Sequence, residues 1–168
     1  MAGSLAHASS LRCSRESGST VRQYDATTGA FIGVFASGNG LNNSEGIVFG
    51  PDGNLYVANE TGSNVLRFNG TTGAFIGSFA TGITDPLGIT LGPNSNLFVG
   101  GSFPEVVRQY NGTTGALIGD FASGSGLNVP WQLVFGPNGD LFVSNSLGPN
   151  ILHDGRFCEN LRIERRAT

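Results

Sequence analysis

The sequence contains no lysine, and only 12% of its 168 residues are charged. Its nine basic residues are therefore all arginines, and six of them lie near the two ends of the chain. The stretch 18–155 carries three arginines against nine acidic residues, a formal charge of −6. A nucleic-acid groove needs clustered cations that displace counterions from phosphate, so the composition predicts no nucleic-acid partner.

Long apolar runs and cysteines are also scarce. No apolar stretch approaches the roughly 18–20 residues needed to cross a bilayer, so no membrane span is expected. The two cysteines, Cys13 and Cys158, are too few for a zinc site or a disulfide framework. We expect free thiols, with a bridge as the alternative if the two ends meet. The start of the chain lacks the apolar segment of a signal peptide, and the compartment is left open with a slight lean to the cell exterior.

Glycine, in contrast, is abundant, with 27 residues in the chain. Short runs of valine, isoleucine and phenylalanine lie between the glycines. A disordered chain would be poorer in apolar residues and richer in charge, so this chain can bury a core. The pattern indicates an all-β protein with many strands joined by tight turns.

The most informative feature is an internal repeat. The letters TTGAFIG begin at Thr27 and again at Thr71, and TTGALIG begins at Thr113, so the copies lie 44 and 42 residues apart. Two further series, GPDGNLYV and VRQYD with their variants, keep the same step. The sequence therefore predicts a repeat unit of about 43 residues.

Each unit is expected to contain four strands, which in one unit cover 46–50, 54–59, 64–68 and 74–80. Their apolar residues alternate or form short solid runs, and the first strand is expected to be buried on both faces. The TTG stretch is a hairpin turn, with glycine at positive φ and threonine hydroxyls bonded to nearby backbone. Four antiparallel strands in 40–45 residues are typical of one blade of a β-propeller.

Two stretches, Ser44–Asn69 and Asp85–Gly101, also resemble a known family. They are similar to NHL repeats, with the pattern Pro-x-Gly-Ile, Asp-Gly-Asn-Leu-Tyr-Val-Ala and Asn-x-Val-x-x-Phe. The resemblance implies a β-propeller and says little about function. Two residues depart from the pattern: Ser44 stands where the family has proline, and Gln132 replaces the glycine that would follow Trp131.

The repeats divide the chain into an atypical N-terminal segment, 1–17, the NHL-like repeats, 18–155, and a basic C-terminal tail, 156–168. The repeats begin at a third strand (21–24) and end at a third strand (150–154). This phase predicts two strands, two complete blades and three more strands, thirteen strands in all. One chain would thus hold about three blades.

Three blades cannot close a ring, because propellers have four to eight. Open ends would also expose strand edges that invite pairing. We therefore expect a homodimer with a six-bladed ring, in which strands 21–24 and 30–36 of one copy complete the last blade of the other. The alternative is that the sequence is a fragment of a longer propeller.

Ligand binding is expected on one face of the propeller. One face carries the nearly constant turns, whereas the other carries loops that differ in length and chemistry: 37–45, 81–87 and 123–130. Variation on a constant frame is typical of binding loops. The mouth of the central channel on this face is the candidate site.

Five residues form the predicted ligand-binding set at this mouth: Glu45, Asn59, Trp131, Gln132 and Asn145. Glu45 is either a carboxylate that faces a ligand or a solvated strand start. Trp131 could stack on a sugar or an aromatic ligand, or plug the channel. Asn59 and Asn145 could bind through their carbonyl oxygens, or cap their own turns.

No catalytic residue, metal or cofactor is predicted. General acid–base chemistry has few donors, since His7 lies in the atypical start and His153 lies in a third strand away from the channel. The favoured interpretation is a non-catalytic scaffold for a protein, peptide or carbohydrate ligand. One alternative is a metal-dependent enzyme similar to the lyases and lactonases of related propellers, and another is a purely structural, self-assembling propeller fragment.

Overall fold

A computed structural model describes residues 20–146, 151–153 and 156–157. His7, Cys13 and Cys158 lie outside the described residues, and the division of the chain at 17/18 and 155/156 stays a prediction. Fourteen strands follow one another in the described part: β1 (Thr20–Tyr24), β2 (Phe31–Ser37), β3 (Ser44–Phe49), β4 (Leu55–Asn59), β5 (Asn64–Phe68), β6 (Phe75–Thr81), β7 (Thr84–Leu91), β8 (Leu97–Phe103), β9 (Glu105–Tyr110), β10 (Leu117–Ser123), β11 (Pro130–Phe135), β12 (Leu141–Asn145), β13 (Ile151–His153) and β14 (Arg156–Phe157).

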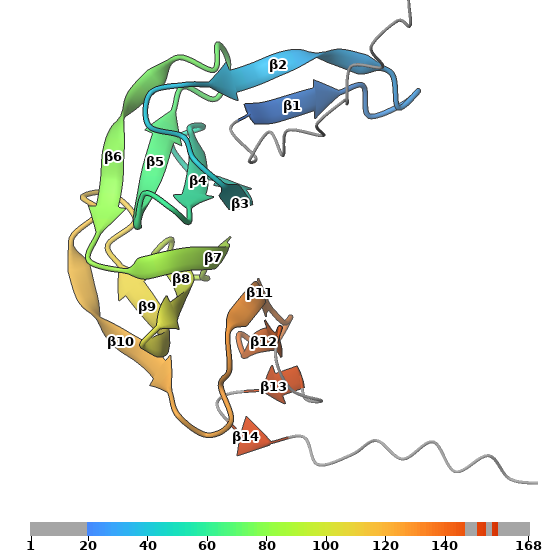
Figure 1. The fold of residues 1–168 in the computed structure, drawn as a ribbon. Helices are drawn as coiled ribbons and strands as arrows, with labels where there is room; N and C mark the ends of the chain where they lie inside the picture. Colours follow the sequence, from blue (N-terminus) through green and yellow to red (C-terminus); the bar gives the residue numbers. More distant parts are fainter. Residues whose placement is uncertain (1–19, 147–150, 154–155, 158–168) are drawn as a thin grey trace, which may run out of the picture.

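These strands form antiparallel sheets in sequence order. Three sheets have four strands each, β3 to β6, β7 to β10 and β11 to β14, and a two-stranded sheet, β1–β2, precedes them. The sheets follow one another along an open arc, with β3, β7 and β11 on its inner side and β2, β6 and β10 on its outer side (Figure 1). The predicted all-β fold and the four-stranded unit are confirmed.

The two end sheets differ from the middle ones. Thirteen strands were expected, and the fourteenth is β14, a strand of two residues that pairs with β13. β13 has three residues, whereas its counterparts β5 and β9 have five and six. Within the described residues, the last sheet therefore has a full inner half, β11–β12, and a short outer half, while β1–β2 is an outer half with no inner half.

The core lies between successive sheets. Along β4, Leu55 and Val57 pack in the cluster shared with β1–β2, whereas Tyr56 and Ala58 pack in the cluster shared with the β7–β10 sheet. A third cluster joins the β7–β10 sheet to β11 and β12. Solid apolar runs such as Leu55 to Ala58 arise because both faces of the strand are covered.

The prediction that the first strand of each unit is buried on both faces is right for β7 and wrong for β3. Ile47 is 50% exposed, whereas its equivalent, Ile89, is 7% exposed. Ile89 packs against the complete sheet that precedes it. Ile47 faces β1–β2, which has no inner strands to cover it.

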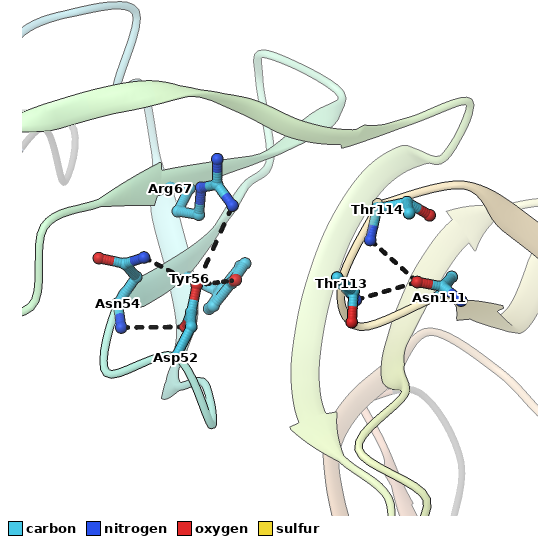
Figure 2. A network of polar contacts seen from close by, with 7 residues as sticks. All are labelled: Asp52, Asn54, Tyr56, Arg67, Asn111, Thr113 and Thr114. Carbon is cyan, nitrogen blue, oxygen red and sulfur yellow. Dashed lines mark hydrogen bonds and ion pairs between the residues drawn. The ribbon is translucent and has the colours of Figure 1, made fainter.

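The repeated TTG stretch forms the expected turn between the third and fourth strands. The Asn111 side-chain oxygen accepts hydrogen bonds from the N–H groups of Thr113 and Thr114, at 3.0 and 2.9 Å (Figure 2). Asp25 and Asn69 make the same pair of bonds in the two earlier copies. The residue two positions before the first threonine, Asp in one copy and Asn in the other two, thus holds the turn together.

The glycine of this turn also makes a close contact with the neighbouring sheet. Gly73 has φ +70°, and a β-carbon there would stand 1.7 Å from the carbonyl oxygen of Phe35 in β2. A β-carbon at Gly115 would likewise stand 1.9 Å from the carbonyl oxygen of Phe79 in β6. The turns at Gly73 and Gly115 therefore pack against the outer strand of the preceding sheet, which explains why the motif recurs along the chain.

We expect Gly73→Ala to destabilise the protein more than Gly53→Ala. Both glycines have positive φ, but nothing lies within 4 Å of a β-carbon at Gly53. Gly53→Ala should cost roughly 1–2 kcal/mol of unfolding free energy for its backbone conformation. Gly73→Ala should cost at least about 2 kcal/mol more, because the sheets must separate. Urea unfolding measures both, and equal losses would contradict the packing role of the turn.

Candidate functional site

The inner strands bring three equivalent positions into a row on the loop face. Glu45, Leu87 and Trp131 lie near the starts of β3, β7 and β11. A β-carbon at Gly46 would stand 2.6 Å from the Leu87 carbonyl oxygen, and one at Gly88 would stand 2.7 Å from that of Trp131. The three inner strands are therefore in close backbone contact, and the row is continuous.

The side chains in this row differ in kind and exposure. Glu45 is partly exposed, Leu87 is buried and Trp131 is 49% exposed. Partial burial raises the pKa of Glu45, and the negative charge of Glu60 adds to the increase. The row thus offers a carboxyl group that protonates more readily than usual at one end and an accessible aromatic ring at the other.

The Asn59 side chain is buried and makes hydrogen bonds to other residues of the chain. It is 1% exposed, and its carbonyl oxygen accepts a hydrogen bond from the Asn42 N–H at 2.6 Å. Its amide donates to the carbonyl oxygen of Gly40 at 3.0 Å and to the side-chain oxygen of Asn64 at 2.8 Å. These bonds clamp the 37–45 loop to the end of β4.

Asn145 makes the corresponding clamp in the last sheet. Its carbonyl oxygen accepts a hydrogen bond from the Asn128 N–H at 3.1 Å, and its amide donates to the Gly126 carbonyl oxygen at 2.9 Å. The middle sheet has Gly101 at this position and so lacks the clamp. The described bonds give both asparagines a role in holding loops, and ligand binding by either of them stays a prediction.

Gln132 is exposed on β11, where the other inner strands have Gly46 and Gly88. Those glycines have no room for a side chain because the next inner strand touches them. No strand of the described part follows β11 on that side, so a larger side chain fits. The departure from the repeat pattern at this position therefore has a structural reason.

The five predicted residues form two groups. Glu45 and Asn59 belong to the β3–β6 sheet, whereas Trp131, Gln132 and Asn145 belong to the β11–β14 sheet. β7 lies between them and contacts both β3 and β11. The structure thus places all five on one face, but it brings them together only within each group.

A polar network on the opposite face was not predicted. Asp52 accepts hydrogen bonds from the Asn54 N–H at 3.1 Å and from the Tyr56 hydroxyl at 2.9 Å, and the Arg67 guanidinium lies 4.0 Å away (Figure 2). Burial alone would raise the pKa of Asp52, but the bonds from Asn54 and Tyr56 and the charge of Arg67 together lower it. The next sheet has Phe98 in place of Tyr56, so this network belongs to one blade.

In the part of the chain that the structure describes, no group of three or more histidine, cysteine, aspartate or glutamate residues is placed to hold a metal ion. Over the same residues, no helix has the length and apolar character that would let it cross a membrane.

No family model matches the sequence, and no curated protein matches it. Solved structures do. A protein described as a putative gluconolactonase is 18% identical over 83% of this chain and 55% of its own, with a TM-score of 0.66. Virginiamycin B lyase from Staphylococcus aureus is 17% identical over 81% and 45%, with a TM-score of 0.65. The WD40 β-propeller domain of Doa1 is 18% identical over 77% and 42%, with a TM-score of 0.62.

The chain has a β-propeller fold. It spans about half the length of these structures, in agreement with the expected three blades. Identities this low show the fold alone. They support a propeller in general and do not single out the NHL type.

We expect Asn59→Ala to lower the unfolding free energy by about 2–3 kcal/mol, because it leaves buried backbone groups without partners. Asn145→Ala is the matched control. It removes two bonds at a more exposed site and should cost about 1 kcal/mol. Urea unfolding at one protein concentration gives both values. Equal, small losses of unfolding free energy in the two variants would contradict the structural role of Asn59 and favour a role in ligand binding.

Glu45→Gln should stabilise the protein at neutral pH and not in acid. Because the folded pKa of Glu45 lies above its ordinary value of 4.5, folding favours the protonated form, and stability is lost as the pH rises through the folded pKa. Glutamine does not ionise, so the variant keeps this stability as the pH rises. The two proteins should therefore unfold alike near about pH 4 and diverge near about pH 7. Glu60→Gln should reduce the difference, and a difference that does not change with pH would contradict the assignment.

Proposed function

We propose that this chain is a non-catalytic scaffold that binds a protein, peptide or carbohydrate ligand on the loop face of a propeller, whose ring is completed by a second copy. The observation that carries the ligand part is the row of Glu45, Leu87 and Trp131. Its backbone is held constant by the blade repeat, while its side chains differ from blade to blade. Such variation on a fixed frame is the usual form of a binding surface.

Trp131 is the residue that we assign to ligand contact. An indole ring buries a large area when it is covered, and its flat face stacks on sugars and on apolar side chains. Half of this side chain is accessible at the start of β11. The low charge of the chain and its abundant asparagine, serine and threonine favour a neutral polar ligand.

The absence of catalysis is part of the proposal. The lyase and gluconolactonase activities named for the similar structures are not transferred, since identities of 17% and 18% support the fold alone. Acid–base chemistry needs groups positioned around a substrate. The one histidine among the described residues, His153, lies in β13 and not in this row, and the sequence contains no lysine. We also propose that the blades are of the NHL type, because the stretches Ser44–Asn69 and Asp85–Gly101 carry motifs similar to NHL repeats.

Light scattering on a sizing column tests the ring. We expect a mass of twice 17.4 kDa, because three blades per chain cannot close a propeller and two copies supply six. A monomer over the whole accessible concentration range would contradict the proposal.

Trp131→Ala then tests the ligand site. Candidate ligands come from arrays of neutral glycans and peptides, and retention on the array is the readout for every variant, because the variants lack Trp131, the single tryptophan. We expect Trp131→Ala to keep the dimer mass and lose array binding, with Trp131→Phe intermediate. Loss of the dimer in Trp131→Ala would show a structural role instead.

A further inference from the structure

The exposed apolar side chains at the ends of the arc have buried counterparts in the middle. Tyr24 in β1 is 54% exposed, whereas its equivalents Phe68 and Tyr110 are fully buried. Phe68 packs in the cluster that joins its sheet to β1–β2, and Tyr110 packs in the cluster that joins its sheet to the β3–β6 sheet. Tyr24 would do the same, but no described sheet precedes β1–β2.

The same comparison holds at the other end. Val134 in β11 is exposed, whereas its equivalent, Val48, packs against the cluster shared with the next sheet. Phe121 in β10 is exposed as well, whereas its equivalent, Phe79, is partly buried. In the middle of the arc, Gly115 of the next turn lies against the Phe79 carbonyl. Val134 therefore has no following sheet in the described part of the chain, whereas Phe121 is followed by the β11–β14 sheet, whose outer strands are short.

The strand lengths show which halves fit together. β1 and β2 form an outer half of five and seven residues with no inner half. β11 and β12 form an inner half of six and five residues, whose outer half has three and two residues in the part of the chain that the structure describes. We propose that β1–β2 of one copy pairs with β12 of a second copy, in place of β13–β14, and that two such exchanges close the ring. This inference rests on the proposed two-copy assembly.

The register of the exchanged pair follows from the complete blade. β4 pairs with β5 so that Ala58 lies opposite Val65. The equivalent residues are Ser144 in β12 and Val21 in β1. Val21 of one copy therefore lies opposite Ser144 of the other, and Gln23 lies two residues further along the same face of β1.

This register also covers the exposed apolar side chains. Between the first two complete sheets, Val48 and Ile89 belong to one buried cluster. Their equivalents at the new junction are Val134 of the second copy and Ile47, both of which are exposed in the single chain. Tyr24 would enter the space in front of the second copy's β7–β10 sheet. Each end of the arc thus covers the exposed apolar side chains at the opposite end of the other copy, as a closed two-fold dimer requires.

Gln132 sets a limit on how tightly this junction closes. Inside the chain the equivalent positions are Gly46 and Gly88, whose β-carbons would stand 2.6 and 2.7 Å from the next strand. The Gln132 side chain must hold the two inner strands further apart at the junction. Gln132→Gly should therefore tighten the dimer, with a dissociation constant roughly tenfold lower by sedimentation. A weaker dimer would overturn the placement of β11 beside β3.

Disulfide trapping tests the exchange directly. In a background with Cys13→Ser and Cys158→Ser, Val21→Cys is combined with Ser144→Cys and oxidised mildly. β1 and β12 lie near opposite ends of the arc (Figure 1), so a bond within one chain is out of reach. The matched control combines Gln23→Cys with Ser144→Cys, which is two residues out of register and too far apart for a good disulfide. We expect the first pair to convert most of the protein to a covalent dimer on a non-reducing gel, and the control to stay monomeric.

The possible outcomes separate this inference from the proposed function. A ladder of larger covalent species would show open-ended pairing and overturn the closed ring. Equal trapping of both pairs would overturn the register. If light scattering shows a dimer but neither pair is trapped, the exchange is wrong and the two-copy ring stands. If light scattering shows a monomer, both fail. Single-cysteine variants with unchanged dimer mass confirm folding, and Gln132→Gly gives an independent measurement.

Discussion

The fold depends on one constraint: each blade is apolar on both faces, and only another blade can cover a face. β4 shows this most clearly, since Leu55 and Val57 point to one neighbour and Tyr56 and Ala58 to the other. The apolar contacts that stabilise the fold therefore lie between neighbouring blades and not within a single blade. The same constraint makes the ends of the arc incomplete. Ile47 is exposed for no local reason, but because the sheet in front of it lacks two strands.

The constant and variable parts of the repeat follow from this constraint. The TTG turn recurs because its glycine fits against the outer strand of the preceding sheet, as Gly73 does against Phe35. On the opposite face, loops are free to vary where no such contact exists. Asn59 and Asn145 hold two of them in place through hydrogen bonds of their side-chain amides. A rigid frame with supported, variable loops is well suited to present Trp131 to a ligand.

Much of the fold could be predicted from the sequence, because a repeat gives the same strand pattern several times. The strands at 21–24 and 64–68 are found within one residue of their expected bounds. The exposure of β3 and the extra strand β14 could not be predicted, since both depend on what lies beyond the end of an incomplete blade. The Asp52 network could not be predicted because Arg67 lies on another strand of the blade and stands where the other units have Gln23 and Gln109.

In the proposed dimer, β1 of one copy gains a second hydrogen-bonded neighbour in another copy. Amide hydrogen exchange measured over a range of protein concentrations detects this new pairing. We expect amides in Thr20–Tyr24 to become protected as the dimer forms, while those of β4 and β5, already inside a complete sheet, do not change. Dimer formation with unchanged exchange in Thr20–Tyr24 would contradict it.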